Sequence, residues 1–376
     1  MGEVVPAPWG GYFLTRYDVC SRVLRDRNWL TPDAAWQDRR GDPRWQAPAT
    51  LEMSHTLPRL NAPVHTRQRR SLGNLFDRAE IERLTPQVER DVAGLLDRLE
   101  EDIRTDGSAE FVHTVADRLP VRTVGQWLGF PAVDDAHILE LTQNQAHAQE
   151  LLPTSSQLAM AAEATLHLRS YFADLVRERR ARPGDDSVSR WIEVWDELEP
   201  DREEADRTLR RLTMFITLAS LETTAALLSS MVWLLLREPG LWAWLRDHPE
   251  HIPDAVEETL RYDPPVNINT RVAGGDTVLA GVPVAKDTMV YVMHGAAHHD
   301  PLRNPDPRTF DVLRRGSHLA FGGGMHYCLG AALARLEARV LLTRLLERFP
   351  DLSLVTPPSF APRMVFRRMT SLSVTA

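Results

Sequence analysis

The sequence has few cysteines and no excess of positive charge. Cys20 and Cys328 are its only cysteines among 376 residues, and they do not form a CxxC pair. A cysteine-rich zinc site is therefore excluded, a disulfide framework is not expected, and a reducing, cytoplasmic setting fits. The formal net charge of -8 argues against a nucleic-acid-binding protein, because such proteins usually carry a basic face.

A secretory signal is also lacking, and only one segment has to be weighed as a membrane span. Residues 1–13 contain no basic start followed by an apolar run. Residues 212–236 are long enough to cross a bilayer, and Glu222 is their only charge. A carboxylate near the middle of a span is costly in lipid, and the segment also contains seven serines and threonines. We therefore expect a helix buried in the protein's centre and no membrane partner.

Apolar residues recur at three-to-four spacing through most of the chain, which predicts a mainly α protein. We expect helices at residues 18–25, 80–104, 112–128, 135–150, 155–182, 212–236, 240–247, 252–262 and 329–349. Short strands are expected at residues 11–15, within 266–292 and within 357–376. No repeat or linker is visible, so residues 1–376 are expected to form one domain with small β-sheets.

Two long stretches are predicted to be irregular. Residues 31–63 contain five prolines together with Trp36 and Trp45, and residues 300–324 are rich in proline, aspartate, arginine and glycine. Long loops inside compact proteins are usually functional or disordered. The embedded aromatic residues favour a functional loop at 31–63.

The sharpest local feature is the segment Phe321-Gly-Gly-Gly-Met-His-Tyr-Cys328-Leu-Gly330. Its glycines allow a tight turn with inward-pointing N–H groups, and the start of the following helix favours a thiolate at Cys328. Such a thiolate is a good soft ligand for iron. Taken alone, however, a cysteine is more often a small buried core residue. A glycine-rich turn before a helix can also cradle a phosphate, although no GK[ST] or GxGxxG pattern is present.

This segment resembles the haem-binding signature of the cytochrome P450 family, F-x-x-G-x-x-x-C-x-G, at Phe321, Gly324, Cys328 and Gly330. Soluble bacterial members are the most similar, over roughly residues 11–374. The resemblance implies a triangular, helix-rich domain with haem b (iron protoporphyrin IX) between the central helix and the helix after the cysteine. Cys328 would ligate the iron, and Phe321, Gly322 and Gly330 would contact the haem.

An E-x-x-R pattern, Glu258 to Arg261, ends one predicted helix. On an exposed helix such a pair contributes little to stability. In the family that this chain resembles, the pair is buried and bonds to an arginine further along, for which Arg314 is the candidate. The implied role is structural support of the haem-binding region.

The central predicted helix contains Ala219-Ser-Leu-Glu222-Thr223, which resembles the family's A-G-x-[DE]-T motif. Reductive cleavage of dioxygen consumes protons, and a carboxylate beside a hydroxyl on a buried helix can relay them. A threonine bonded back to its own helix is the plainer alternative for Thr223. Ser220 stands where the family usually has glycine, at a point where the helix is commonly loosened for oxygen. The resemblance implies that Glu222 and Thr223 are catalytic and that Ala219 contacts the haem.

A buried haem also needs cations for its two carboxylates. His65 and Arg69 match the family's H-x-x-x-R, Arg271 matches an arginine on a following strand, and His326 matches a fourth position. Two departures stand out. His298 and His299 replace a usual Asn-Arg, and relatives usually carry a further helix before the first strand. The second departure implies a short N-terminus and a more open substrate entrance.

The resemblance implies a mono-oxygenase that activates O2 with electrons from a ferredoxin and an NAD(P)H-dependent reductase, because the sequence shows no flavin or nucleotide motif of its own. Arg67 and Arg70 belong to an expected basic patch for an acidic ferredoxin. The substrate is expected to be a small natural-product intermediate, and the protein a monomer. Expected substrate contacts are Trp36, Ile216, Ser220, Val266, Asn267, Ile268, Asn269, Val365 and Phe366.

Three alternatives to hydroxylation are considered. Cytochrome P450-like proteins that only activate a partner enzyme lack the thiolate cysteine, so Cys328 disfavours a non-catalytic role. Peroxygenases of the family carry a different pair in place of Glu222 and Thr223. Oxidative coupling or desaturation stays open, since no motif separates these outcomes from hydroxylation.

Overall fold

The computed structural model describes residues 2–376, which pack as two compact units. Unit 1 consists of the chain up to Leu30, Pro86–Leu119 and Thr223–Ala376, and unit 2 of Thr31–Thr85 and Pro120–Glu222. Helices α5 (Arg78–Asp106), α6 (Arg118–Leu128) and α10 (Arg202–Arg237) run from one unit into the other. The prediction of a mainly α protein with small sheets is confirmed.

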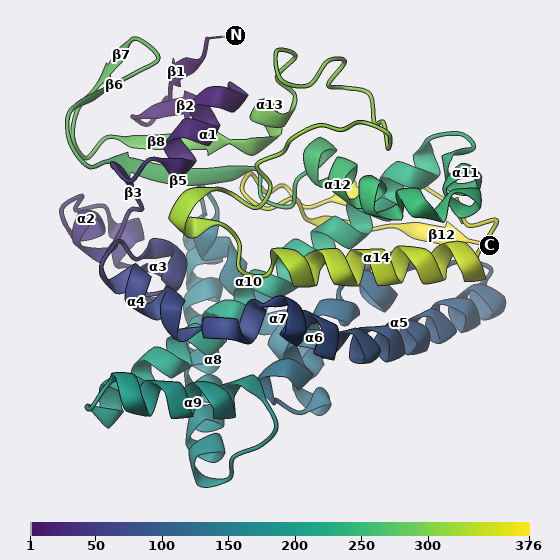
Figure 1. Ribbon diagram of the computed structural model, residues 1–376, viewed down its shortest axis with the longest axis horizontal. Coiled ribbons are helices and arrows are strands. Elements are labelled where there is room, and N and C mark those ends of the chain that lie inside the picture. The colour runs from purple at the N-terminus through teal and green to yellow at the C-terminus, as the bar shows by residue number, and fades with distance from the viewer. Residues whose placement is uncertain (1) are drawn as a thin grey trace. The chain divides into compact units, whose positions relative to one another are not determined.

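The largest sheet lies in unit 1 and joins distant parts of the sequence. Its strand order is β1-β2-β8-β5-β3, with bounds Val4–Pro6, Tyr12–Leu14, Met289–Met293, Ile268–Ala273 and Trp29–Leu30. Figure 1 shows the purple N-terminal strands beside the green strands β5 and β8. β2 pairs with β8 in parallel, with Phe13 opposite Tyr291, and β5 pairs with β8 antiparallel.

Helix α1 (Tyr17–Arg25) packs its apolar face against this sheet. Val19, Cys20, Val23 and Leu24 recur at three-to-four spacing and are buried with sheet residues such as Val290. This helix matches the expectation for residues 18–25, because one apolar face at helical spacing is the strongest pattern that a sequence offers.

Besides its parts of α5, α6 and α10, the described rest of unit 1 contains four α-helices and three small sheets. The helices are α11 (Leu241–Asp247), α12 (Ile252–Tyr262), α13 (His294–His298) and α14 (Ala331–Arg348). One sheet has the order β4-β12-β9 (Ala109–Glu110, Ser373–Thr375, Ser353–Leu354). The other two pair β10 with β11 (Ser359–Phe360, Met369–Ser371) and β6 with β7 (Thr277–Leu279, Val282–Val284).

Unit 2 contains no strand among the residues described. Its helices are α2 (Ala34–Asp38), α3 (Pro48–Ser54), α4 (Val64–Ser71), α7 (Asp135–Gln145), α8 (Ser155–Ala181) and α9 (Ser187–Leu198), besides its parts of α5, α6 and α10. Glu80 ties several of them together, since Trp127 Nε1 and Arg190 Nη2 lie 2.8 and 2.7 Å from its Oε1.

Helix α10 is long and apolar enough to span a membrane by length and composition alone. In the structure, 78% of its most apolar stretch is buried inside the protein. The prediction of a buried core helix is confirmed, and the helix is longer than the predicted residues 212–236 because the mostly polar residues 202–211 are helical as well.

Two of the differences from the predicted secondary structure lie in unit 2. Residues 31–63 are not irregular but contain α2, α3 and the 3-10 helices Pro43–Gln46 and Leu57–Arg59. Pro43 and Pro48 each occupy a first helical turn, where the missing N–H costs nothing. Helix α9 was missed altogether, although Asp186 caps it by accepting from the Ser189 N–H at 2.8 Å.

Candidate active site

Cys328 lies in a turn that depends on glycine. Gly322 and Gly324 have φ of +71° and +63°, a region that other residues rarely adopt. A Cβ on Gly324 would also lie 2.7 Å from the carbonyl oxygen of Leu24, so the turn packs directly on α1. The Cys328 N–H closes the turn by donating to the Phe321 carbonyl at 2.9 Å. The thiol therefore stands just before α14, on a turn whose backbone is fixed.

The two cysteines have opposite environments. Cys20 is fully buried, and its S–H donates to the Leu14 carbonyl at 3.2 Å. Burial raises the pKa of Cys20 to about 12, so this thiol stays protonated and acts as a core residue. Cys328 is exposed and free of any disulfide. Of the two, only Cys328 has the access that a ligand or nucleophile needs.

A charged clamp holds the segment that leads to Cys328. Arg335 on α14 binds Glu257 of α12 through both guanidinium arms, at 2.6 and 2.8 Å, and His318 Nε2 lies 3.0 Å from the same carboxylate. The Arg335 guanidinium also lies 4.5 Å from the centre of the Phe321 ring. Burial would raise the pKa of Glu257, but the bonds from Arg335 and His318 outweigh it and lower that pKa to about 2.

The predicted E-x-x-R pair is buried in unit 1. Glu258 and Arg261 are 2% and 1% exposed, and their side chains are joined by two bonds of 2.6 and 2.7 Å. Arg314 Nε lies 3.3 Å from Glu258 Oε1. Arg261 further donates to the carbonyls of Pro307, Thr309 and His298, so a single side chain holds α12, α13 and the 300–324 stretch.

His298 has a bridging role that the sequence analysis did not assign. The Leu319 N–H donates to its Nε2 at 2.7 Å, and its Nδ1 lies 3.0 Å from the Arg261 carbonyl. Nε2 is thus an acceptor and Nδ1 carries the proton. Burial lowers the pKa of His298 well below its usual value, so the ring stays neutral. The only signal in the sequence was that a histidine stands where the family usually has asparagine.

Helix α10 is buried over most of its length but has an accessible strip. Ala219 is exposed and Ser220 and Thr223 are half-buried, whereas Ile216 and Glu222 are buried. The Ser220 hydroxyl donates to the Ile216 carbonyl at 2.8 Å, and the α-helix runs without a break from Arg202 to Arg237. At Ser220 the helix is therefore not broken, and the serine hydroxyl is used in a bond within the preceding turn.

The four predicted propionate cations are divided between the units. His65 is buried and lies one turn from Arg69 on α4 in unit 2. In unit 1, Arg271 is buried on β5 and donates to the Thr270 carbonyl at 2.8 Å, and His326 forms the end of the 3-10 turn Gly324–His326 next to Tyr327. Cations of this kind suit the carboxylates of a haem.

The donor set also fits an iron porphyrin. Among residues 2–376, no group of three or more His, Cys, Asp or Glu side chains can hold a metal ion. A metal at Cys328 would therefore take its other ligands from a prosthetic group. A single accessible thiol, with the buried Arg271 and the half-buried His326 in the same unit, fits what a haem takes from a protein.

The predicted substrate residues of unit 1 lie together. Val266 forms a β-bridge with Phe366, and the Asn267 N–H donates to the Val365 carbonyl at 2.8 Å. Ile268 is buried on β5. Asn269 Nδ2 lies 2.9 Å from His294 Nε2, so part of its amide is already bound inside the protein.

Trp36, in unit 2, is less accessible than a substrate contact would suggest. It is 5% exposed and packs edge-on against Trp45, with ring centres 5.7 Å apart. The Arg40 guanidinium covers it at 4.5 Å from the ring centre.

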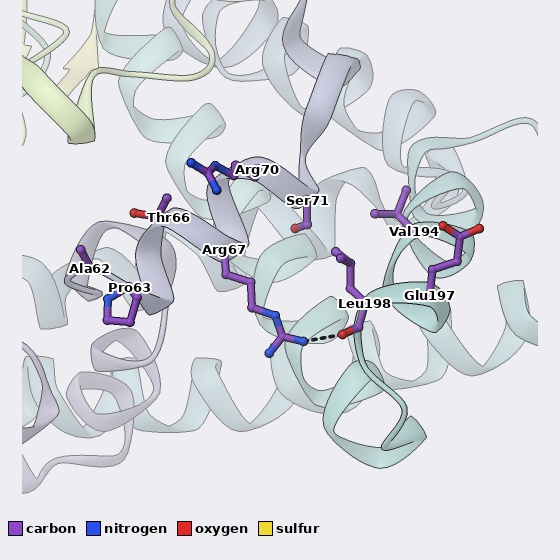
Figure 2. A pocket seen from close by; sticks show the side chains of 9 residues that line it. All are labelled: Ala62, Pro63, Thr66, Arg67, Arg70, Ser71, Val194, Glu197 and Leu198. Carbon is purple, nitrogen blue, oxygen red and sulfur yellow. Dashed lines mark hydrogen bonds between the residues drawn. The ribbon is translucent and has the colours of Figure 1, made fainter.

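A groove of about 660 Å³ runs between α4 and α9 within unit 2 (Figure 2). Its lining includes Arg67, Arg70, Glu197, Leu198 and Val194. Arg67 donates to the Leu198 carbonyl at 2.6 Å and pairs with Glu199 at 3.0 Å, so its charge is partly neutralised. Arg70 is exposed and has no ion pair among the residues that the structure describes.

The chain was compared with protein-family models, with characterised relatives and with solved structures. The family model described as Cytochrome P450 matches residues 152–372. Nocardicin C N-oxygenase of Nocardia uniformis subsp. tsuyamanensis is 34% identical over 369 residues, covering 95% of this chain and 87% of that protein. The cytochrome P450 monooxygenase PikC of Streptomyces venezuelae is 32% identical, covering 96% and 84%. The crystal structure of P450BioI with a ligated acyl carrier protein superimposes with a TM-score of 0.88 at 28% identity, covering 97% and 92%.

Proposed function

The chain belongs to the cytochrome P450 family of oxidoreductases, and we propose that it is a haem-thiolate mono-oxygenase with Cys328 as the iron ligand. The observation that carries the assignment is the contrast between the cysteines. Cys328 is exposed on a fixed glycine turn, whereas Cys20 is buried with a pKa raised to about 12. Arg271 and His326 of unit 1 would bind the haem propionates, a role that the resemblance also implies for His65 and Arg69.

A bound haem supplies the oxygen chemistry, which a thiolate ligand favours by donating electron density to the iron. The residues of this chain do the rest. Glu222 is buried and Thr223 half-buried on the accessible side of α10, so together they can deliver protons from solvent to the reacting oxygen. The Glu257–Arg335 clamp keeps the Cys328 turn in place.

The reduced carbon-monoxide spectrum tests the ligand assignment. We expect the red-shifted Soret band of thiolate ligation in the wild type and in Cys20→Ala. In Cys328→His we expect the shorter-wavelength band of an imidazole ligand. A red-shifted band that survives Cys328→His would overturn the assignment, and a haem-free but folded wild type would overturn the proposed function.

Proton delivery is tested by the coupling of electron use to product. Glu222→Gln keeps the size of the side chain but removes the titrating group. We expect slower product formation, by a factor of about 100, and a larger share of reducing equivalents lost as peroxide. Unchanged rates and coupling in both Glu222→Gln and Thr223→Val would remove these residues from the mechanism.

For the substrate, we propose a small natural-product intermediate. The support comes from relatives whose names state such roles, among them nocardicin C N-oxygenase and 6-deoxyerythronolide B hydroxylase. In unit 1, contacts would come from the β-bridged residues Val266 and Phe366. The resemblance implies the same role for Ile216 and Ser220, which lie on α10 in unit 2. Spin-state shifts over a panel of such compounds would identify binders.

Oxidative coupling or desaturation is the second candidate. A structure described as an enzyme for C–S bond formation in chuangxinmycin biosynthesis superimposes with a TM-score of 0.85 at 27% identity. Product mass separates the outcomes, since hydroxylation adds one oxygen atom and coupling or desaturation removes two hydrogens.

We propose that an acidic ferredoxin, reduced by an NAD(P)H-dependent reductase, delivers the electrons, and that it docks at the α4–α9 groove of Figure 2. Arg70 is the better probe than Arg67, because reversing Arg67 would also break its bond to Glu199. We expect Arg70→Glu to slow reduction about tenfold at low salt and less at high salt. Arg177→Glu, an exposed arginine on α8 outside the groove, is the control. Equal reduction rates in the two variants would contradict this docking site.

A further inference from the structure

Three arginines converge on one buried carboxylate in unit 2. Glu52 on α3 is 6% exposed, and its Oε1 lies 2.8 Å from Arg210 Nη2 and 3.7 Å from Arg211 Nε of α10. Arg169 Nε of α8 lies 3.4 Å from Glu52 Oε2. We call these four residues the Glu52 cluster. It joins three helices that are far apart in sequence, and the 31–63 segment supplies its acidic member.

The charges of the cluster do not balance. One carboxylate faces three guanidinium groups, which leaves an excess of two positive charges. Two further carboxylates, Asp38 and Glu204, act on neighbouring His55 at longer range, and Glu204 is paired with Arg207 at 2.8 Å. Buried like charges without enough counter-charge are costly.

The hydrogen-bond donors of the cluster are not all used. Within residues 2–376, no hydrogen-bond acceptor is found for Arg210 Nη1 or Arg211 Nε, although both atoms are buried. The Arg210 side chain is 8% exposed, whereas that of Arg169 is 49% exposed and opens the cluster to solvent. Arg210 thus has unused donors at the base of the cluster, and Arg169 is reachable at its rim. Together they form a site that an anion can enter.

The electrostatics around the cluster agree with this picture. Burial lowers the pKa of His55 and the charge of Arg211 lowers it further, whereas Glu52, Asp38 and Glu204 raise it. Burial also lowers the pKa of Arg210, with Arg169 and Arg211 acting in the same direction against Glu52. The guanidinium groups of Arg169 and Arg211 are therefore close enough to act on Arg210 as like charges.

We infer that the Glu52 cluster is an anion-binding site for a doubly charged oxyanion of the phosphate-monoester type. A phosphate monoester carries between about -1.5 and -2 at neutral pH, which matches the excess of two charges, whereas a carboxylate would cancel only one. Its three terminal oxygens can accept from Arg169, Arg210 and Arg211 together. Assigning this phosphate to the substrate would rest on the proposed function, but anion binding itself does not.

Calorimetric titration of the purified holoenzyme with inorganic phosphate tests the site. We expect saturable binding at one site per chain. Acetate at equal ionic strength should bind about tenfold more weakly, because it leaves one charge of the cluster uncompensated. Sodium chloride should show no saturable binding. Neither readout uses the carbon-monoxide spectrum, so failure of this site and failure of the proposed function are distinguishable.

Substitutions separate an anion site from a purely structural ion cluster. Arg169→Gln removes the half-exposed cation and should weaken phosphate binding about tenfold, whereas Arg177→Gln on the same helix should leave it unchanged. Glu52→Gln removes the competing carboxylate, so it should strengthen phosphate binding severalfold while lowering the melting temperature in phosphate-free buffer. If the ion pairs of the Glu52 cluster served only the fold, Glu52→Gln would lower the melting temperature without strengthening phosphate binding.

The site is overturned if phosphate binds no better than chloride, if Arg169→Gln and Arg177→Gln bind it equally, or if Glu52→Gln binds it more weakly than the wild type. Arg169→Gln decides alone should Glu52→Gln fail to fold, since Arg169 lies at the solvent side of the cluster.

Discussion

Replacing Arg261 by glutamine should destabilise the protein far more than its spacing from Glu258 suggests. The substitution removes two bonds of 2.6 and 2.7 Å to a carboxylate that is 2% exposed, together with donations to three backbone carbonyls. Removing one partner of a buried ion pair costs about 3–5 kcal/mol, because the other charge stays buried. Arg314, at 3.3 Å from Glu258, keeps the expected loss near the lower end.

The chain offers a matched control on α5. Glu101 and Arg104 have the same residue types and the same spacing, with a shortest bond of 2.6 Å, but their side chains are 54% and 71% exposed. Arg104→Gln should therefore leave the free energy of unfolding almost unchanged. Urea unfolding followed by tryptophan fluorescence measures both, and double-mutant cycles with Glu258→Gln and Glu101→Gln isolate each pair. A loss below about 1 kcal/mol for Arg261→Gln would refute the reasoning from burial.

Three further predictions concern Glu257, the two cysteines and His298. The lowering of the Glu257 pKa from 4.5 to about 2 corresponds to at most ~3 kcal/mol; with the side chain 41% exposed, we expect Glu257→Gln to cost roughly 1 kcal/mol. This difference should be complete above pH 4.5 and vanish as the pH falls towards 2, as measured by denaturation at a series of pH values. In haem-free folded protein, a thiol reagent should modify Cys328 alone, and mass spectrometry should find Cys20 modified only after unfolding. His298→Asn should lower the free energy of unfolding by about 1–3 kcal/mol, because two buried hydrogen bonds are lost. His299 is half-buried, and an equal loss of stability in His299→Asn would show that the His298 bridge is unimportant.

Much of the fold was readable in the sequence, because long amphipathic helices leave a strong periodic pattern. Residues 252–262 were predicted with the bounds that α12 has, and 155–182 missed those of α8 by one residue. Short elements were harder. Helix α13 and the helices of residues 31–63 are too short for a clear period, and their prolines stand at helix starts as well as in loops.

For the candidate site, the sequence predicted residue types but not the contacts that they make. His298 appeared only as a departure from the family pattern, and its two bonds to Leu319 and Arg261 depend on backbone groups that α12 and the 319 region bring together. The Glu52 cluster left no signal at all, because its members are single charges on three helices. Ion pairs between helices that are far apart in sequence cannot be predicted from the local spacing of residues.

The sequence by itself determined that the protein is mainly helical, that it resembles cytochrome P450 enzymes, and which residue types could serve a haem. It did not determine which copy of a motif matters. E-x-x-R occurs five times, at Glu80–Arg83, Glu101–Arg104, Glu199–Arg202, Glu204–Arg207 and Glu258–Arg261, and by spacing alone the five are equivalent. Only the tertiary structure buries both partners of the last pair, and it likewise buries Cys20 while leaving Cys328 accessible. The physical reason is that the strength of an ion pair and the reactivity of a thiol are set by desolvation, and desolvation depends on what the rest of the chain packs around them.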